Sequence, residues 1–280
     1  MDMKKRKFVR LTVSYLIILV VFAVILYPVF WIIGSSLNPG DSLSGSSVIP
    51  KHATFAHYKA LFDPAHSKYL LWYWNTLKIC FCTMILTVVL VGLMGYAFSR
   101  YRFYGRKNGL MTFLVLQMIP NFAALIAIYV LATVTHLLDT HLALILLYTG
   151  GLLPMNTYLA KGYFDTIPKE LDESARIDGA GHLRIFIQII LPLAAPILAV
   201  IALFAFISPF ADFILAGVIL RSADKYTLAV GLYDLIANQF GNQFTEFAAG
   251  AVLIAVPISF LFLSLQRYLI SGLTTGSTKG

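Results

Sequence analysis

Residues 170–192 read ELDESARIDGAGHLRIFIQIILP, and this stretch joins a polar segment to an apolar one. Its first part holds Glu170, Asp172 and Glu173, and carboxylates at such places favour the positive end of a helix dipole. Gly179 follows the polar part, where a residue in the left-handed conformation can end a helix. The remainder is apolar and resumes a helix. We therefore predict a short amphipathic helix, a glycine elbow and a second helix that enters a membrane.

The predicted short helix needs a cap at its start and a cover for its apolar side. Asp165 or Thr166 can cap it, with Pro168 in the first turn, where the missing N–H of proline would be unpaired in any case. Three apolar residues spaced by four form one stripe: Ile167, Leu171 and Ala175. Either lipid headgroups or a groove on a partner protein must cover this stripe. Interfacial helices carry Lys and Arg on their polar side, whereas this side is acidic, so a protein groove is the expected cover.

The composition of the chain is that of an integral membrane protein. Of its 280 residues, 59% are hydrophobic and only 12% are charged, and the mean hydropathy is +0.81. A soluble domain has about 25% charged residues, so lipid must be the solvent for much of this chain. The net charge of +8 would first suggest nucleic acid as a partner. The positions of the charges, which follow the membrane topology, argue against nucleic-acid binding.

Several apolar segments are long enough to cross a hydrocarbon core of roughly 30 Å. They are residues 11–33, 71–98, 110–132, 142–159, 187–207 and 247–269. The sequence therefore predicts an all-α membrane protein with six transmembrane helices in one membrane domain. The first span is expected to be a retained anchor, because its apolar stretch exceeds the roughly 7–15 residues of a signal peptide and lacks a small-residue cleavage site.

The Lys and Arg residues predict the orientation of the spans. With a cytoplasmic N-terminus, the only ones outside are Lys51, Lys59, Lys68, Lys78, Arg221 and Lys225. This excess inside predicts that both termini are cytoplasmic. The expected organisation is a cytoplasmic N-terminus (1–10), a first transmembrane helix (11–34), an extracytoplasmic loop (35–70), a transmembrane core (71–269) that contains the inner loop 161–188, and a cytoplasmic tail (270–280). A short helix is expected near residues 55–62 of the outer loop.

The residue pattern offers no catalytic or metal centre. The histidines are scattered over predicted loops without metal-ligand spacing, and Cys80 and Cys82 lie in an apolar run, where packing is the simplest role. No G-x-x-x-x-G-K-[ST] phosphate loop occurs. An ion-coupled secondary transporter is a remote alternative, because the predicted spans contain no carboxylates to bind the coupling ion.

The quoted stretch carries a recognisable spacing. Glu173-Ser174-Ala175, three residues, Gly179, nine residues and Ile189-Ile190-Leu191-Pro192 resembles the signature loop of binding-protein-dependent ABC importer permeases, whose pattern is E-A-A, three, G, nine, I-x-L-P. Ser174 is the one departure, and it keeps the residue small. The resemblance implies a type I ABC importer permease fold, with this loop as the coupling helix that seats in a cleft on an ATP-binding subunit. It assigns ATPase coupling to Glu173, Ser174, Ala175, Gly179, Ile189, Leu191 and Pro192.

Further stretches resemble the carbohydrate-uptake branch of this family. They are residues 75–77 (NTL), 96–100 (YAFSR), 105–107 (GRK) and 226–232 (YTLAVGL). The ending at residues 272–280 is similar to the tail of the smaller maltose/maltodextrin permease subunit, where the tail slips between the two ATPase subunits. The resemblance assigns that contact to Gly272, Thr274, Gly276 and Lys279, and an unstructured terminus is the alternative.

Two further groups of polar residues are candidate contacts. By the same resemblance, Asn238, Gln239, Gly241 and Asn242 lie in an outer loop that reaches toward a sugar-binding protein. Gln117, Asn121 and Asn156 lie in predicted spans and can hydrogen-bond a sugar in the substrate pathway. Hydrogen bonding between helices is the competing role for these three residues.

The resemblance implies a complete set of partners for a bacterial-type inner-membrane importer. They are a homologous second permease subunit, two cytoplasmic ATP-binding subunits that carry ATP and Mg, an extracytoplasmic sugar-binding protein and membrane lipid. The chain itself is then not an enzyme and holds no cofactor, because the ATPase lies on other subunits. The expected cargo is maltose or maltodextrins, with galacto-oligosaccharides or another sugar as the alternative, moved inward by ATP-driven alternating access.

Overall fold

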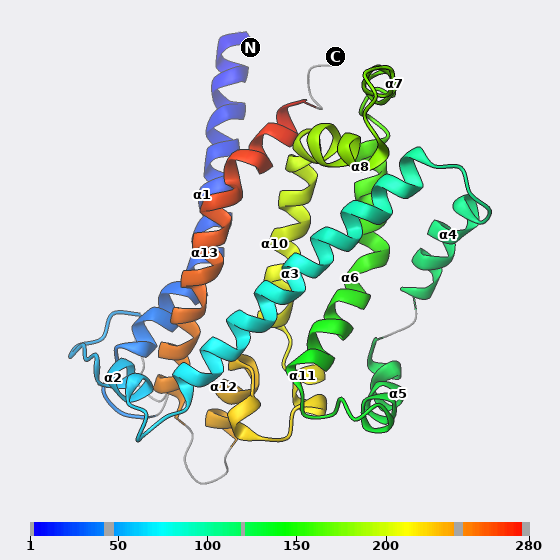
Figure 1. Ribbon diagram of the computed structural model, residues 1–280. Helices are drawn as coiled ribbons and strands as arrows, with labels where there is room; N and C mark the ends of the chain where they lie inside the picture. Colours follow the sequence, from blue (N-terminus) through cyan, green and yellow to red (C-terminus); the bar gives the residue numbers. More distant parts are fainter. Residues whose placement is uncertain (1–2, 42–47, 119–120, 238–242, 276–280) are drawn as a thin grey trace. The chain divides into compact units, whose positions relative to one another are not determined.

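The computed structural model describes residues 3–41, 48–118, 121–237 and 243–275, and every element in these ranges is a helix (Figure 1). The chain divides into two compact units. The first consists of Met1–Leu70 and Leu232–Ala255, and the second of Leu71–Gly231 and Val256–Gly280. Four helices are long and apolar enough to cross a membrane: α1 (Met3–Ser36), α3 (Tyr69–Arg100), α6 (His141–Phe164) and α13 (Phe244–Thr275).

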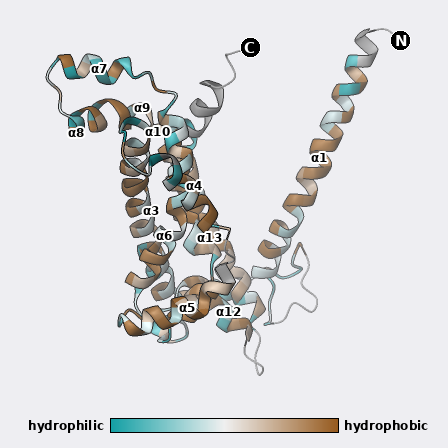
Figure 2. Ribbon diagram, turned by 90° about the vertical axis from the view of Figure 1, so that its right-hand side faces the viewer, coloured by the Kyte–Doolittle hydropathy of each residue, from teal (hydrophilic) through white to brown (hydrophobic). Residues whose placement is uncertain are grey.

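Helix α1 is apolar along most of its length, as the hydrophobic colouring in Figure 2 shows. Its most hydrophobic window contains no buried residue, so leucine, isoleucine, valine and phenylalanine side chains are exposed there. Apolar area left in water is unfavourable by about 25 cal/mol per Å². The helix therefore requires lipid or another protein around it, which agrees with the predicted anchor.

The outer loop of the first unit is folded rather than extended. It contains the expected short helix, α2 (Ala56–Phe62). Nε2 of His57 lies 2.8 Å from the carbonyl oxygen of Asn38, and the Thr245 hydroxyl donates a hydrogen bond of 2.7 Å to the Gly40 carbonyl. These bonds fix the segment that leaves α1 against the start of α13.

The third predicted span is broken. Residues 110–132 fall in two helices, α4 (Arg106–Leu116) and α5 (Asn121–Val134), each too short to cross a membrane alone. Helix α4 ends at Leu116 and α5 begins at Asn121, and residues 119–120 between them lie outside the described part of the chain. Figure 1 shows α4 beside the end of α6 that leads to α7, and α5 at the other end of α6.

The fifth predicted span is bent rather than straight. It consists of α8 (His182–Ile185), a π-helical turn (Phe186–Ile190), α9 (Leu191–Leu193) and α10 (Ala195–Ala211). The bend between His182–Leu193 and Ala195–Ala211 is 79°. Pro192 and Pro196 lack the N–H groups that would pair with carbonyls four residues earlier, which accounts for both the wide turn and the bend. Among the described residues, four helices, or five segments with the bent pair, are thus long and apolar enough to cross a membrane, and the six-span topology remains a prediction.

The remaining elements complete the second unit. They are α7 (Glu170–Ile177), α11 (Ile214–Ile219), a 3-10 turn (Ala223–Lys225) and α12 (Leu228–Ala237), whose last residues belong to the first unit. Helix α6 packs on α10, and it approaches α3 so closely that a Cβ at Gly95 would lie 3.0 Å from the Ala160 Cβ. Small residues allow such close approach between membrane helices.

Candidate coupling site

Helix α7 is a short polar helix between α6 and α8, and Figure 2 shows hydrophilic and hydrophobic residues alternating along it. No side chain in the described part of the chain caps its start. The Thr166 hydroxyl instead donates back to the Tyr163 carbonyl at 2.7 Å, and the Asp165 carboxylate binds other partners. The predicted cap by Asp165 or Thr166 is therefore wrong, because both residues complete the end of α6.

The predicted glycine elbow at the end of α7 is confirmed. Gly179 has a φ of +81°, its N–H donates to the Arg176 carbonyl at 3.0 Å, and the N–H of Ala180 donates to the Ala175 carbonyl at 2.9 Å. These two bonds are the Schellman pattern, which satisfies carbonyl groups at a helix end. A Cβ at Gly179 would meet nothing within 4 Å, so conformation rather than space requires glycine here.

The predicted apolar stripe divides between two sides of the helix. Ile167 and Ala175 pack into a cluster of the chain's own core that also contains Phe164, Ile185 and Phe186. The third member of the stripe, by contrast, is exposed. The apolar residues left uncovered on and after α7 are Leu171 (42% exposed), Ile177 (87%) and Leu183 (67%). The uncovered set is therefore the surface that needs a partner.

The other motif residues also fall into two groups. Glu173 and Ser174 are exposed, as is Pro192. Ile189 and Leu191 are half-buried and pack against the same core cluster as Ala175. The polar residues Glu173 and Ser174 are thus left on the surface, whereas Ile189 and Leu191 hold the loop to its own chain.

A buried ion pair attaches α7 to the end of α3. Nε of Arg100 lies 2.6 Å from Oδ2 of Asp172, with side chains only 3% and 5% exposed. The same guanidinium donates 2.9 Å to the Ile167 carbonyl and 3.2 Å to the Ser99 hydroxyl. Asp172 was expected on the acidic side of the helix, and its pairing with Arg100 was not predicted. Its only signal was the YAFSR stretch, which ends in Arg100.

Ser99 and Asp165 extend the ion pair to the end of α6. The Ser99 hydroxyl donates 2.7 Å to the Asp165 carboxylate, which also pairs with the Lys161 ammonium at 2.5 Å. Burial alone would raise the pKa of the Asp165 carboxyl, but hydrogen bonds from Lys161 and Ser99 outweigh it, and the pKa lies below its ordinary value. The carboxylate therefore stays charged and joins α3 to α6.

Aromatic rings attach the end of α3 to the other flank of the elbow. The rings of Tyr96 and Phe186 have centroids 5.0 Å apart, and those of Tyr101 and His182 are 5.2 Å apart. Such ring pairs contribute about 0.5–1.5 kcal/mol beyond their buried area. The end of α3 thus contacts both α7, before the elbow, and α8 with its π-helical turn, after it.

Comparison with known proteins decides the family. A sequence model described as "Binding-protein-dependent transport system inner membrane component" matches residues 88–275. The chain belongs to this family. It is 52% identical over 280 residues to the galactooligosaccharides transport system permease protein GanQ of Bacillus subtilis, covering 100% of this chain and 99% of that protein. It is 49% identical over 267 residues to the maltodextrin transport system permease protein MdxG of the same organism, covering 95% of each.

A solved structure confirms the fold of this permease. A chain from a bacterial ABC transporter involved in the import of the acidic polysaccharide alginate superposes with a TM-score of 0.80 at 24% identity. The match covers 96% of the permease and 98% of that chain. The type I importer fold implied by the loop motif is therefore confirmed.

Hydrogen bonds also fix the start of α3, at the opposite end from Arg100. The Asn75 amide donates to the carbonyls of Asp224 and Tyr226 at 2.9 and 3.1 Å, and the Thr76 hydroxyl accepts the Leu228 N–H at 2.7 Å. The two sequence stretches noted as typical of carbohydrate permeases, residues 75–77 and 226–232, are therefore partners in space. Their shared role is to hold the segment before α12 on α3.

The predicted substrate-pathway residues make backbone contacts. The Gln117 amide donates 3.0 Å to the Gly151 carbonyl of α6, and the buried Asn156 amide donates 2.7 Å to the Leu152 carbonyl of its own helix. Both contacts are of the kind that stabilise helices. The side chain of Asn121, the first residue of α5, lies outside the described part of the chain.

The other predicted contacts of the permease lie largely outside the described residues. These are Asn238, Gln239, Gly241 and Asn242 of the outer loop, and Gly276 and Lys279 of the tail. Gly272 and Thr274 lie in the last turns of α13, where only the helical backbone is described. All of these assignments remain predictions.

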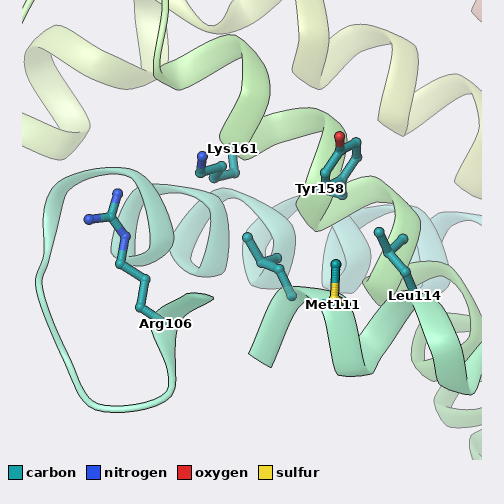
Figure 3. A pocket seen from close by; sticks show the side chains of 6 residues that line it. Arg106, Met111, Leu114, Tyr158 and Lys161 are labelled. Carbon is teal, nitrogen blue, oxygen red and sulfur yellow. The ribbon is translucent and has the colours of Figure 1, made fainter. Parts of the chain in front are cut away.

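A pocket of about 480 Å³ lies between α4 and α6 (Figure 3). Its lining consists of Arg106, Leu110, Met111, Leu114, Tyr158 and Lys161. Both cations already have partners within the chain. Arg106 donates to the Phe98 and Ser99 carbonyls at 2.7 and 3.1 Å, and Lys161 pairs with Asp165. The pocket therefore offers a ligand little uncommitted charge.

Proposed function

We propose that this chain is one of two permease subunits of a bacterial inner-membrane importer that moves oligosaccharides inward by ATP-driven alternating access. Family membership supports the assignment to an ABC importer. The exposed residues of the coupling motif are the proposed contact with the ATP-binding subunit. The single observation that supports oligosaccharides as the substrate is the full-length similarity to the two Bacillus subtilis permeases, whose names specify galactooligosaccharides and maltodextrin.

The coupling step follows from the two sides of α7. Glu173, Ser174 and the exposed Leu171 and Ile177 seat in a cleft on a cytoplasmic ATP-binding subunit, while the opposite side stays on the permease core. ATP and Mg belong to a pair of such subunits, and their closure pushes α7. A sugar-binding protein outside delivers the cargo to a pore shared with a homologous second permease, and hydrolysis resets the pore.

The orientation in this proposal places both termini and α7 in the cytoplasm. The distribution of Lys and Arg supports it, since the loops on the α7 side hold most of the basic residues. The exposed face of α1 then lies in lipid or against the second permease. Asn238–Asn242 extend toward the binding protein, and the tail from Gly272 reaches the ATP-binding subunits.

Replacement of a relative tests the function and distinguishes the cargoes. Bacillus subtilis strains in which this chain replaces GanQ or MdxG are assayed for uptake of labelled galactobiose and maltotriose, with strains that carry an empty locus as the control. Uptake of either sugar above the empty locus supports the proposal, and the sugar that enters identifies the cargo. If the chain reaches the membrane and neither sugar enters in either strain, the oligosaccharide proposal is refuted.

A further inference from the structure

We infer that α3 is a second element driven by the coupling helix, and that the buried Arg100–Asp172 ion pair is the link that moves it. The inference rests on the proposed function and deepens it, because it assigns a positioning role to two residues outside the signature motif. Asp172 immediately precedes Glu173, yet the two carboxylates face different environments: Asp172 is buried and Glu173 is exposed.

The two chain segments that connect α7 to α6 and α8 would pass on only part of a movement of α7. On one side is the Gly179 elbow, a single turn with a left-handed residue. On the other side, a non-helical connection that contains Pro168 separates α7 from the end of α6. Both connections contain residues whose dihedral angles can change, which is the property of a hinge. A helix held only by two hinges would tilt in place when its partner pushes it.

The ion pair supplies the rigid contact that the hinges lack. Arg100 is the last residue of α3, and its guanidinium reaches the Asp172 carboxylate at 2.6 Å and the Ile167 carbonyl at 2.9 Å. Because both side chains are almost fully buried, separating them would leave two uncompensated charges out of water, which is strongly unfavourable. Movement of α7 must therefore carry the end of α3 with it.

The aromatic contacts make α3 follow the loop as one body. Tyr96 packs on Phe186 beyond the elbow, while Arg100 holds Asp172 before it. The end of α3 thus touches both arms of the coupling loop. At its far end, the Asn75 and Thr76 contacts fix α3 to the segment that leads into α12. A displacement of α7 is in this way transmitted along α3 to the opposite end of the second unit.

The test compares transport with ATP hydrolysis in the assembled importer. Complexes carrying Asp172→Asn, Arg100→Lys or the reversed pair Arg100→Asp with Asp172→Arg are reconstituted with their ATP-binding subunits and binding protein. Arg102→Gln is the matched control, because Arg102 lies close by in the chain but is exposed. Assembly, ATPase activity stimulated by the binding protein, and sugar uptake are measured on each complex.

For Asp172→Asn we expect an assembled, ATP-hydrolysing complex whose sugar moved per ATP falls by about tenfold, within the range of measured allosteric couplings. Arg100→Lys keeps the charge but loses the fork that also binds Ile167, so its ratio should fall by a smaller factor. The reversed pair should recover part of the ratio, and Arg102→Gln should match the wild type. A role in folding alone would reduce assembly and leave the ratio unchanged.

Two outcomes separate the inference from the proposed function. A wild-type complex that moves no sugar refutes the oligosaccharide importer. A wild-type complex that transports, together with Asp172→Asn or Arg100→Lys complexes that move as much sugar per ATP as wild type, refutes the link through α3. If Asp172→Asn fails to assemble, the Arg100→Lys ratio decides, because that variant retains a cation beside Asp172.

Discussion

Replacing Gly179 with threonine should uncouple transport without preventing membrane insertion. The φ of +81° at this position is open to glycine and strained for a β-branched residue. Holding a non-glycine residue there costs about 1–3 kcal/mol. This cost lowers the population of the elbow with its left-handed residue at position 179 by about 5- to 150-fold. A Cβ would meet nothing within 4 Å, so steric crowding adds no further cost.

Gly181 provides a matched control two residues away. Its φ is −73°, which any residue adopts, and a Cβ there would also meet open space. Gly181→Thr even places a favourable N-cap residue at the start of α8. The two variants add the same side chain to the same exposed loop and differ in the conformation they must accept.

The assay is sugar uptake in membranes, with co-purification of the ATP-binding subunits as a second measurement. We expect Gly179→Thr to lose at least about fivefold of uptake, the lower end of the population shift, and Gly181→Thr to retain wild-type uptake. Equal uptake by the two variants at equal membrane levels would show that the left-handed elbow has no part in coupling.

Three further substitutions test contacts within the second unit. Gly231→Ala would place a Cβ closer to the Trp72 ring than van der Waals contact allows, so we expect a loss of about 1–3 kcal/mol, seen as a lower thermal unfolding midpoint in detergent; an unchanged midpoint would contradict this close packing. Thr76→Val removes the buried acceptor of the Leu228 N–H and should cost about 1–3 kcal/mol by the same measurement; a midpoint equal to that of the wild type would refute the role of this bond. Asp139→Asn should lower the midpoint at pH 7. Burial alone would raise the pKa of Asp139, but hydrogen bonds from Ser222 and neighbouring amides hold it below its ordinary value of about 3.9. Its stabilising effect is therefore fully present above that value and lost as pH falls through the folded pKa, so the difference from wild type should shrink in acid; a difference that persists there would refute the ionic role.

Local chemistry was enough to predict the parts of the structure that depend on few residues. The elbow at Gly179 followed from the position of a glycine after an amphipathic segment, and a short helix was expected where α2 lies in the outer loop. The long apolar helices followed from length alone. In each case, the responsible residues lie within a few turns of one another, so no knowledge of distant contacts was needed.

Features that depend on distant contacts could not be predicted in this way. Hydropathy predicted the apolar spans at 110–132 and 187–207, and Pro120, Pro192 and Pro196 mark places where a helix can kink. The 79° angle of the second span depends on how its two helices pack against the rest of the chain, which no local pattern gives. The residue that attaches α7 to the core lies at position 100. No periodicity within the loop could reveal that α3 ends beside it.

Helix α7 has one side packed on the chain's own core and one exposed side, and this division bears on where its motif departs from the family pattern. A single amphipathic stripe was predicted because an eight-residue helix was assumed to have one cover. In the structure, Ala175 packs on the chain's own cluster, whereas Ser174 is exposed on the side left for a partner. A hydroxyl at position 174 can stay hydrated or hydrogen-bond across an interface, whereas a polar group at position 175 would lie against the apolar cluster on which Ala175 packs. The departure from the family pattern therefore falls at position 174, where the exposed helix side accepts serine. Ala175, which packs on the apolar cluster, keeps the residue of the pattern.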